Sequence, residues 1–164
     1  MNIAMASAPP QAGAEILERI LEAPSGLVVL ESQHVEALIE QVRALARHSG
    51  QSVYLWQPGA GLGNLREAHA RVPDCERLGN ALRYMQQSMH FGVYFLRGLE
   101  LPLSTPDATA LRRLARSPKG HIRRVVLIDA PHALVAYLGD LAALVSGDGG
   151  NSRNLRLRDG RWVA

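Results

Sequence analysis

Hydrophobic residues along the chain fall into short continuous runs, separated by longer stretches in which apolar residues recur at helical spacing. Four runs are rich in β-branched or aromatic residues, which is typical of strands buried on both faces. These runs are Leu27–Glu31, Ser52–Trp56, Phe91–Leu96 and Arg124–Ile128. Because strands that alternate with helices favour parallel pairing through right-handed crossovers, the pattern predicts an α/β fold.

The helical stretches lie between these runs. Val35, Leu38, Ile39, Val42 and Leu45 share one face of a predicted helix, which Gly50 should end. The other expected helices cover Ala14–Ala23, Asp74–Met89, the basic stretch Asp107–Ser117, and a last segment that starts near Pro131 and runs to Val145. Proline is favoured in the first turn of a helix, which supports the start near Pro131.

The two ends of the sequence have different predicted roles. We expect residues 1–13 to be a flexible start rather than a signal peptide, and residues 14–164 to form a single domain. Near the other end, Asp159-Gly160 is a two-residue hairpin signal that would pair Leu157 with Trp162.

Composition restricts the function classes. The chain has 164 residues, 47% of them hydrophobic, with a formal net charge of +3. Its one cysteine, Cys75, excludes an intrachain disulfide and a cysteine-rich zinc site. No apolar run approaches the roughly 20 residues of a membrane-spanning helix. We therefore expect a cytoplasmic protein that does not bind membranes, and the mild charge argues against nucleic acid as a partner.

A glycine-rich stretch follows the second predicted strand. Gly59, Gly61 and Gly63 are spaced differently from the dinucleotide fingerprint, because Asn64 stands where the last glycine would be. The stretch also lacks the lysine of a phosphate loop, since the chain's only lysine is Lys119. Two interpretations stay open: a turn that requires positive φ, or an anion site of backbone N–H groups at a helix start.

Polar residues follow the other predicted strands. In open α/β sheets, ligands bind beyond the carboxyl ends of the strands. Candidate ligand-binding residues there are Glu31, Glu100, Asp129 and His132, together with the three glycines. Carboxylates with an imidazole suit a divalent metal, but helix starts also attract such residues, and Asp129 alone could cap the following helix.

Other catalytic signatures are missing. Ser32 lacks the Gly-x-Ser-x-Gly turn of a hydrolase nucleophile. Cys75 stands between Asp74 and Glu76, whose charges should raise the pKa of its thiol. We therefore expect neither residue to be a nucleophile.

Arginines gather in two segments of the sequence. The candidate interaction residues are Arg112, Arg113 and Arg116 on the basic helix, and Arg156, Arg158 and Arg161 near the C-terminus. Such clusters suit an acidic partner, although solvated charge on a surface helix and an edge strand gives the same pattern.

The order of elements resembles the RecA-like, degenerate amino-terminal domain of some AAA-type ATPases of plastids and bacteria. The resemblance covers Gly26 to Leu144: a strand that ends in an acidic residue leads directly into a helix, and the strands "VYLW", "VYFLRGLE" and "RRVVLID" follow. It implies a three-layer, mainly parallel sheet with helices on both faces, to which the C-terminal hairpin would be added. Arg97 and Gly98 depart from it, because an acidic residue should end that strand.

These observations predict a function class. We expect a non-catalytic interaction or regulatory domain with a degenerate nucleotide-binding site, no cofactor and no metal. Its partner would be another protein of unknown identity, with a homo-oligomer as one form of such contact. The alternative is a small-molecule or phosphate-binding protein, including a metal-dependent enzyme that uses the acidic residues at the strand ends.

Overall fold

The computed structural model describes residues 10–67, 69–116 and 123–147. Its α-helices are α1 (Pro10–Glu22), α2 (Val35–Ser49), α3 (Leu78–Gln87), α4 (Thr105–Ala115) and α5 (His132–Leu138). Its strands are β1 (Leu27–Glu31), β2 (Val53–Gln57), β3 (Gly61–Asn64), β4 (Arg71–Val72), β5 (Gly92–Arg97), β6 (Arg123–Ile128) and β7 (Ala143–Ser146).

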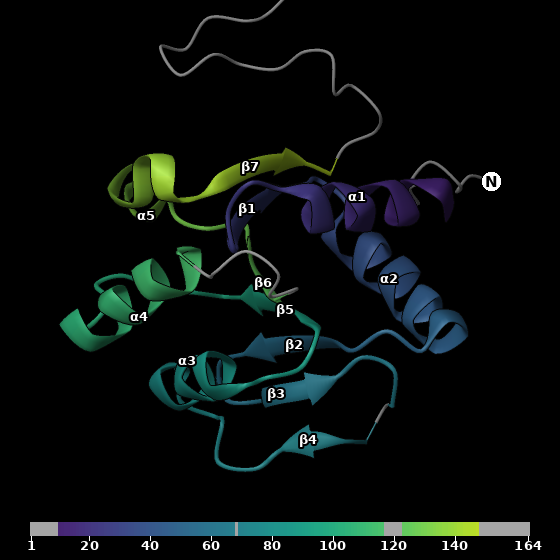
Figure 1. Cartoon of the computed structure of the whole chain (residues 1–164), viewed down its shortest axis with the longest axis horizontal. Helices are drawn as coiled ribbons and strands as arrows, with labels where there is room; N and C mark the ends of the chain where they lie inside the picture. Colours follow the sequence, from purple (N-terminus) through teal and green to yellow (C-terminus); the bar gives the residue numbers. More distant parts are fainter. Residues whose placement is uncertain (1–9, 68, 117–122, 148–164) are drawn as a thin grey trace, which may run out of the picture.

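The strands form one sheet in the order β4-β3-β2-β5-β6-β1-β7 (Figure 1). Strands β2, β5, β6, β1 and β7 run parallel to one another, and β3 and β4 add an antiparallel edge beside β2. Parallel pairing requires crossover connections, and helices supply them. The predicted α/β fold with a mainly parallel sheet is confirmed, and it is consistent with a RecA-like three-layer architecture.

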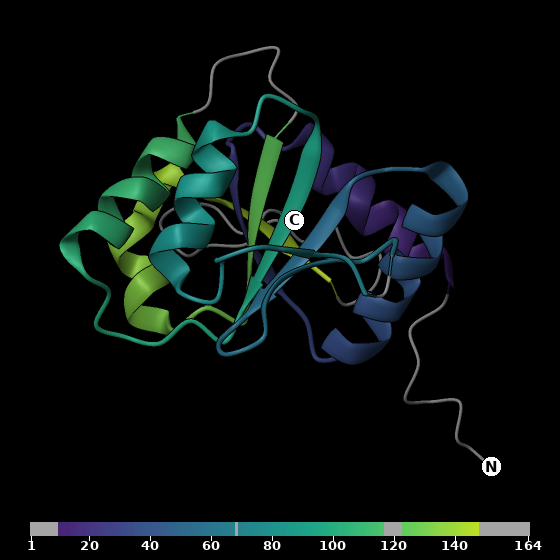
Figure 2. The same cartoon turned by 90° about the horizontal axis from the view of Figure 1, so that it is seen from below.

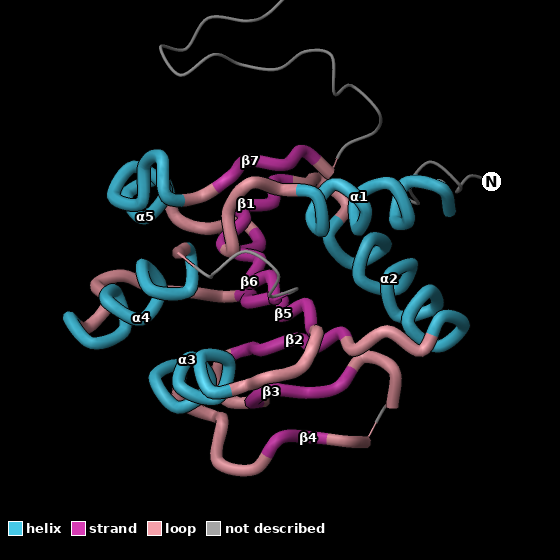
Figure 3. The backbone as a smooth tube through the Cα atoms, viewed as in Figure 1, coloured by secondary structure: helices cyan, strands magenta, loops and turns pink. Residues whose placement is uncertain are grey.

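Helices cover both faces of the sheet (Figure 3). Helices α1 and α2 pack on one face, and α3, α4 and α5 pack on the other, as the view from below also shows (Figure 2). Successive residues of a strand point to opposite faces, so Val28 and Leu30 enter the first core whereas Leu27 and Val29 enter the second. This explains why the strands are continuously apolar in sequence.

Two adjacent arginines at the start of β6 fasten helices on opposite faces. Arg123 donates from Nη1 to the carbonyl oxygens of Met85 (2.8 Å) and Gln86 (3.2 Å), at the end of α3. Arg124 donates to carbonyl oxygens at and beyond the end of α1, those of Ile20, Leu21 and Ala23. Burial lowers the pKa of each guanidinium, but arginine stays charged and complements the negative end of a helix.

The sequence interpretation was wrong about the segment after Pro131. We expected one helix to Val145, but α5 ends at Leu138, a short 3₁₀ turn covers Gly139–Leu141, and β7 follows. Gly139 has φ 53°, outside the helical region. Pairing with β1 makes the last apolar residues a strand, with Val28 opposite Ala143 and Leu30 opposite Val145.

The ends of the chain are described only in part. Helix α1 begins at Pro10, four residues before the predicted start at Ala14. The predicted C-terminal hairpin lies outside the described residues, as do Arg156, Arg158 and Arg161. In the described part of the chain, no helix combines the length and apolar character needed to cross a membrane.

Candidate functional site

The carboxyl ends of the parallel strands form the edge where ligands bind in open α/β sheets. At this edge β1 connects to α2 through only three residues, Ser32 to His34. The Ser32 hydroxyl accepts a hydrogen bond from the backbone N–H of His34 at 2.9 Å, which fixes this short turn. The predicted direct entry from strand to helix is confirmed.

A cavity of about 520 Å³ opens beside this turn. It is lined by the turn, the first turn of α2, the last residue of β5 and the residue after β6, namely Ser32, Gln33, His34, Val35, Glu36, Ala37, Arg97 and Asp129. Its size falls within the range of about 300–1,000 Å³ usual for ligand sites. The candidate residue Asp129 therefore lies in a cavity. The other residues that line the cavity, including Glu36 and Arg97, were not predicted as ligand-binding residues.

An ion pair spans the cavity. A guanidinium nitrogen of Arg97, at the end of β5, lies 2.6 Å from a carboxylate oxygen of Glu36, in the first turn of α2. The Glu36 side chain is 80% exposed, so solvent screens the pair and its contribution to stability is small. Its position matters more, because it places a carboxylate in the first turn of α2, at the end of a helix where negative charge is favoured. Nothing in the linear sequence links residues 36 and 97, so Glu36 was missed.

Asp129 does not cap helix α5, which corrects that interpretation. The N-cap position is Pro131, and no side-chain hydrogen bond is made there. Asp129 is exposed and adopts the left-handed conformation with φ 53°, which aspartate tolerates better than most residues. Its backbone N–H donates to the carbonyl oxygen of Leu30 (3.3 Å), which extends the hydrogen bonding between β6 and β1 by one residue.

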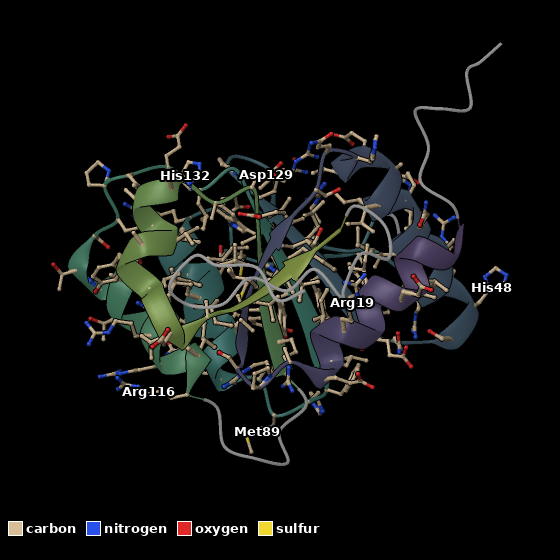
Figure 4. The ribbon with its side chains drawn as sticks, turned by 90° about the horizontal axis from the view of Figure 1, so that it is seen from above. Arg19, His48, Met89, Arg116, Asp129 and His132 are labelled. Atoms are coloured by element: carbon tan, nitrogen blue, oxygen red, sulfur yellow. The ribbon has the colours of Figure 1, made fainter. Side chains whose placement is uncertain are left out.

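The other candidate residues of the strand ends do not join Asp129 in the cavity. His132, the first residue of α5, lies at the same edge (Figure 4). Glu31 is the last residue of β1 and Glu100 comes three residues after β5. None of the three lines the cavity. Within residues 10–67, 69–116 and 123–147, no three histidine, cysteine, aspartate or glutamate side chains gather as a metal site would require.

The glycine stretch is a β-hairpin and does not begin a helix. Gly59 has φ 78° in a turn closed by the bond from the Ala60 N–H to the Gln57 carbonyl oxygen (3.2 Å). Gly61 and Gly63 then lie in β3, paired with β2. The interpretation as a turn with positive φ is confirmed at Gly59, and the anion site at a helix start is wrong, because the next helix begins only at Leu78.

None of the three glycines of this hairpin lines the cavity. Two strands, β2 and β5, separate β3 from β6, whose end carries Asp129. The three glycines and Asp129 were predicted together as ligand-binding residues at the strand ends, and the order of the strands separates them. The start of the turn packs beside the residue that follows β5, since a Cβ added to Gly98 would stand 2.9 Å from Cδ of Pro58.

The described arginines of the basic helix are all exposed. Arg112 donates to the hydroxyl of Tyr137 on α5 at 3.1 Å, and its guanidinium lies 6.0 Å from the centre of that ring. Arg113 lies with Arg83 around a hollow of about 380 Å³ between α3 and α4. Arg116 lies at the opposite end of the strands from Asp129 (Figure 4). The basic helix therefore presents charge outward, away from the cavity.

Cys75 is buried, and burial raises the pKa of its thiol, with further contributions from Glu76 and then Asp74. The predicted direction is confirmed, although burial was the missing and larger cause. The backbone carbonyl of Cys75 accepts a hydrogen bond from the indole nitrogen of Trp56 at 2.9 Å. Through this hydrogen bond and its buried side chain, Cys75 holds the segment before α3 against the core.

The model of one protein family, described as the SpoVK-like AAA ATPase, N-terminal domain, matches residues 14–145. The chain belongs to this family. The match takes in most of α1 and almost all of β7, and so runs from the first helix to the last described strand. No curated protein and no solved structure matches the chain. As a SpoVK-like N-terminal domain, the chain is of a kind found in AAA ATPases, which suggests a regulatory or interaction role.

Proposed function

We propose that this SpoVK-like N-terminal domain is a non-catalytic interaction domain whose nucleotide-binding position is degenerate. The observation that carries the proposal is the three-residue connection from β1 to α2. A phosphate loop of the NTPase type has the eight-residue pattern G-x-x-x-x-G-K-[ST] between strand and helix. Three residues are too few to wrap around a phosphate group.

The charges at this position support the same conclusion. Glu36 places a carboxylate at the start of α2, where a bound phosphate would accept hydrogen bonds from backbone N–H groups. The negative charges of the carboxylate and the phosphate would repel each other. Arg97 occupies the end of β5, where an acidic residue would hold a metal ion in an NTPase. The only lysine of the chain, Lys119, lies far along the sequence from this turn. The site therefore lacks the parts that stabilise a transferring phosphoryl group.

Purified protein should release no phosphate from ATP or GTP with Mg²⁺ above the rate of a buffer blank. The reason is the missing lysine and acidic residue, on which phosphoryl transfer depends for charge stabilisation. The assay follows inorganic phosphate over hours at high protein concentration. Release that disappears in both Asp129→Ala and Glu100→Ala would contradict the proposal, because a contaminating ATPase would be unaffected by these substitutions.

The cavity itself supports a second candidate function, the binding of a small anionic molecule. Arg97 offers a guanidinium in a cavity of about 520 Å³, and guanidinium groups bind carboxylates and phosphates. Binding would require Arg97 to exchange Glu36 for the ligand. A screen of phosphorylated compounds by thermal shift tests this function: a hit that Arg97→Met removes supports it, and an identical hit in that variant places the ligand elsewhere.

A further inference from the structure

An apolar hollow of about 290 Å³ lies where α4 and α5 meet the loop that follows β5. Ala108 lines it from α4, Leu134 and Tyr137 are among the residues that line it from α5, and residues 101–103 line it from the loop. In the part of the chain that the structure describes, four large hydrophobic side chains are exposed. Two of them, Tyr137 (53% exposed) and Leu101 (42% exposed), stand at this hollow. Exposed apolar surface that gathers in one place is typical of an interaction site.

The size of the hollow suits a single side chain of a docking segment. Its volume lies just below the range of about 300–1,000 Å³ that is usual for sites of whole small molecules. Protein interfaces commonly bury a few large side chains of one partner in pockets of the other, and these anchors carry most of the binding energy. We therefore expect the occupant to insert one large apolar side chain.

A guanidinium group stands at the rim of the hollow. Arg112 of α4 donates to the hydroxyl of Tyr137 at 3.1 Å, and its Cζ atom lies 6.0 Å from the centre of that ring. Tyr137 therefore connects the two features, because it lines the hollow and also orients Arg112. Arg112 is exposed, and a bond to one hydroxyl leaves most of its five N–H donors available.

No acidic residue of the described chain neutralises Arg112. Ion pairs in this part of the chain are those of Glu40 with Arg43 and of Glu36 with Arg97. Asp107, in the first turn of α4, lines the separate hollow between α3 and α4, and neither Glu100 nor Asp140 lines the apolar hollow. The charge at the rim is therefore that of Arg112, and it favours a carboxylate from a partner.

We propose that the apolar hollow and Arg112 together bind an acidic amphipathic helix of another protein. One large apolar side chain of that helix enters the hollow, and an aspartate or glutamate pairs with Arg112. The inference rests on the proposed function, an interaction domain, and names the surface and the chemistry of the partner. We call the hollow with Arg112 the α4–α5 site.

The spacing within the α4–α5 site fits a helix. The guanidinium of Arg112 and the Tyr137 ring that lines the hollow are 6.0 Å apart. Residues three or four positions apart on a helix have Cβ atoms about 5–6 Å apart, so they can reach both points at once. An amphipathic helix that inserts apolar anchors into a groove is a recurring mode of peptide recognition.

A phage-displayed library of random peptides, selected on the immobilised full chain, tests the proposal. Peptides of about 16 residues are long enough to form a helix. Enriched peptides should share a large apolar residue with an aspartate or glutamate three or four positions away. One enriched peptide is then labelled with fluorescein, and fluorescence polarisation measures its affinity for the wild type and for variants.

Two matched pairs of variants separate the parts of the site. Ala133→Phe fills the hollow from α5 and should weaken the peptide about tenfold or more, the loss usual for an anchor. Ala136→Phe is its control, because Ala136 is exposed on the same helix and does not line the hollow. Arg112→Glu should weaken the peptide by a similar factor, whereas Arg113→Glu, the same change at a neighbour that lines the α3–α4 hollow, should leave the affinity unchanged.

A peptide whose acidic residue is replaced by lysine tests the ion pair directly. It should bind the Arg112→Glu variant more tightly than it binds the wild type, and the original peptide should show the reverse preference. A merely structural role of Arg112 would weaken both peptides alike. Circular dichroism checks that each variant is folded, and Arg112→Gln replaces Arg112→Glu if it is not.

Several outcomes would overturn the proposal: no enriched peptide, enriched peptides without an acidic residue, or binding that Ala133→Phe and Arg112→Glu leave intact. A DNA oligonucleotide that Arg112→Glu releases and Ala133→Phe does not would assign Arg112 to nucleic acid. A self-association that Ala133→Phe abolishes would assign the hollow to a second copy of the chain. These outcomes leave the proposed non-catalytic role standing, whereas phosphate release in the assay above removes that role whatever the peptides do.

Discussion

At the scale of single residues, the arginines at the start of β6 show that side-chain direction decides the role of a charge. Arg124 points to the face of the sheet that α1 covers and donates to the carbonyl oxygens of Ile20, Leu21 and Ala23 at 3.0–3.2 Å. Arg116 is exposed and ends α4. We therefore expect these two arginines to contribute differently to the free energy of unfolding.

We expect Arg124→Met to lower the free energy of unfolding by about 1–3 kcal/mol, because it leaves several partly buried carbonyl oxygens without a charged donor. Arg116→Met should change it by less than about 0.5 kcal/mol, as is usual for exposed substitutions. Urea denaturation followed by circular dichroism measures both values. Equal effects of the two substitutions would mean that the helix-end hydrogen bonds of Arg124 do not contribute to stability.

At the scale of elements, two helices on one face approach each other closely where α1 carries a glycine. The backbone N–H of Gly13 donates to Oε1 of Gln41 on α2 at 2.8 Å. A Cβ added at Gly13 would stand 2.7 Å from Cβ of Gln41, a contact that only movement of a helix can relieve. The close packing of α1 on α2 therefore requires a residue without a Cβ at position 13.

Gly13→Ala should lower the free energy of unfolding by about 1–3 kcal/mol through overpacking, although alanine is the better helix former by about 1 kcal/mol. The matched substitution is Gly79→Ala in α3. Its added Cβ would meet the side chain of Asp107, with Oδ1 at 3.0 Å and Cγ at 3.9 Å, and this flexible end can rotate away. We expect Gly79→Ala to be neutral or stabilising in the same urea titration. A stabilising Gly13→Ala would show that α1 and α2 are not in such close contact.

At the scale of the whole molecule, nucleotide should not change the stability of the domain. A ligand present at 100 times its dissociation constant adds about 2.7 kcal/mol to the free energy of unfolding. For a domain of this size, that would raise the melting temperature by roughly 5–11 °C. Because the turn from β1 to α2 has only three residues, we expect millimolar ATP with Mg²⁺ to leave the melting temperature unchanged in differential scanning calorimetry. A rise of several degrees would contradict the degenerate site.

Local pattern alone determined much of the framework of this protein. Strand β1 begins and ends at the predicted residues Leu27 and Glu31, and Gly50 ends α2 in the left-handed conformation with φ 74°. These features depend on nearby residues: a continuous apolar run, a helical repeat and a residue without a Cβ. The direct passage from β1 into α2, on which the proposed function rests, was therefore visible in the sequence.

The tertiary structure decided the features that depend on distant partners. The residues of β7 have a spacing compatible with a helix, and only pairing with β1, more than 100 residues earlier, makes them a strand. The same holds for the site: Arg97 meets Glu36 because β5 ends and α2 begins at the same edge of the sheet, and the glycines are separated from Asp129 because β2 and β5 lie between them. The spacing of apolar residues in the sequence indicates whether a segment suits a helix or a strand. The order of the strands in the sheet depends on long-range packing.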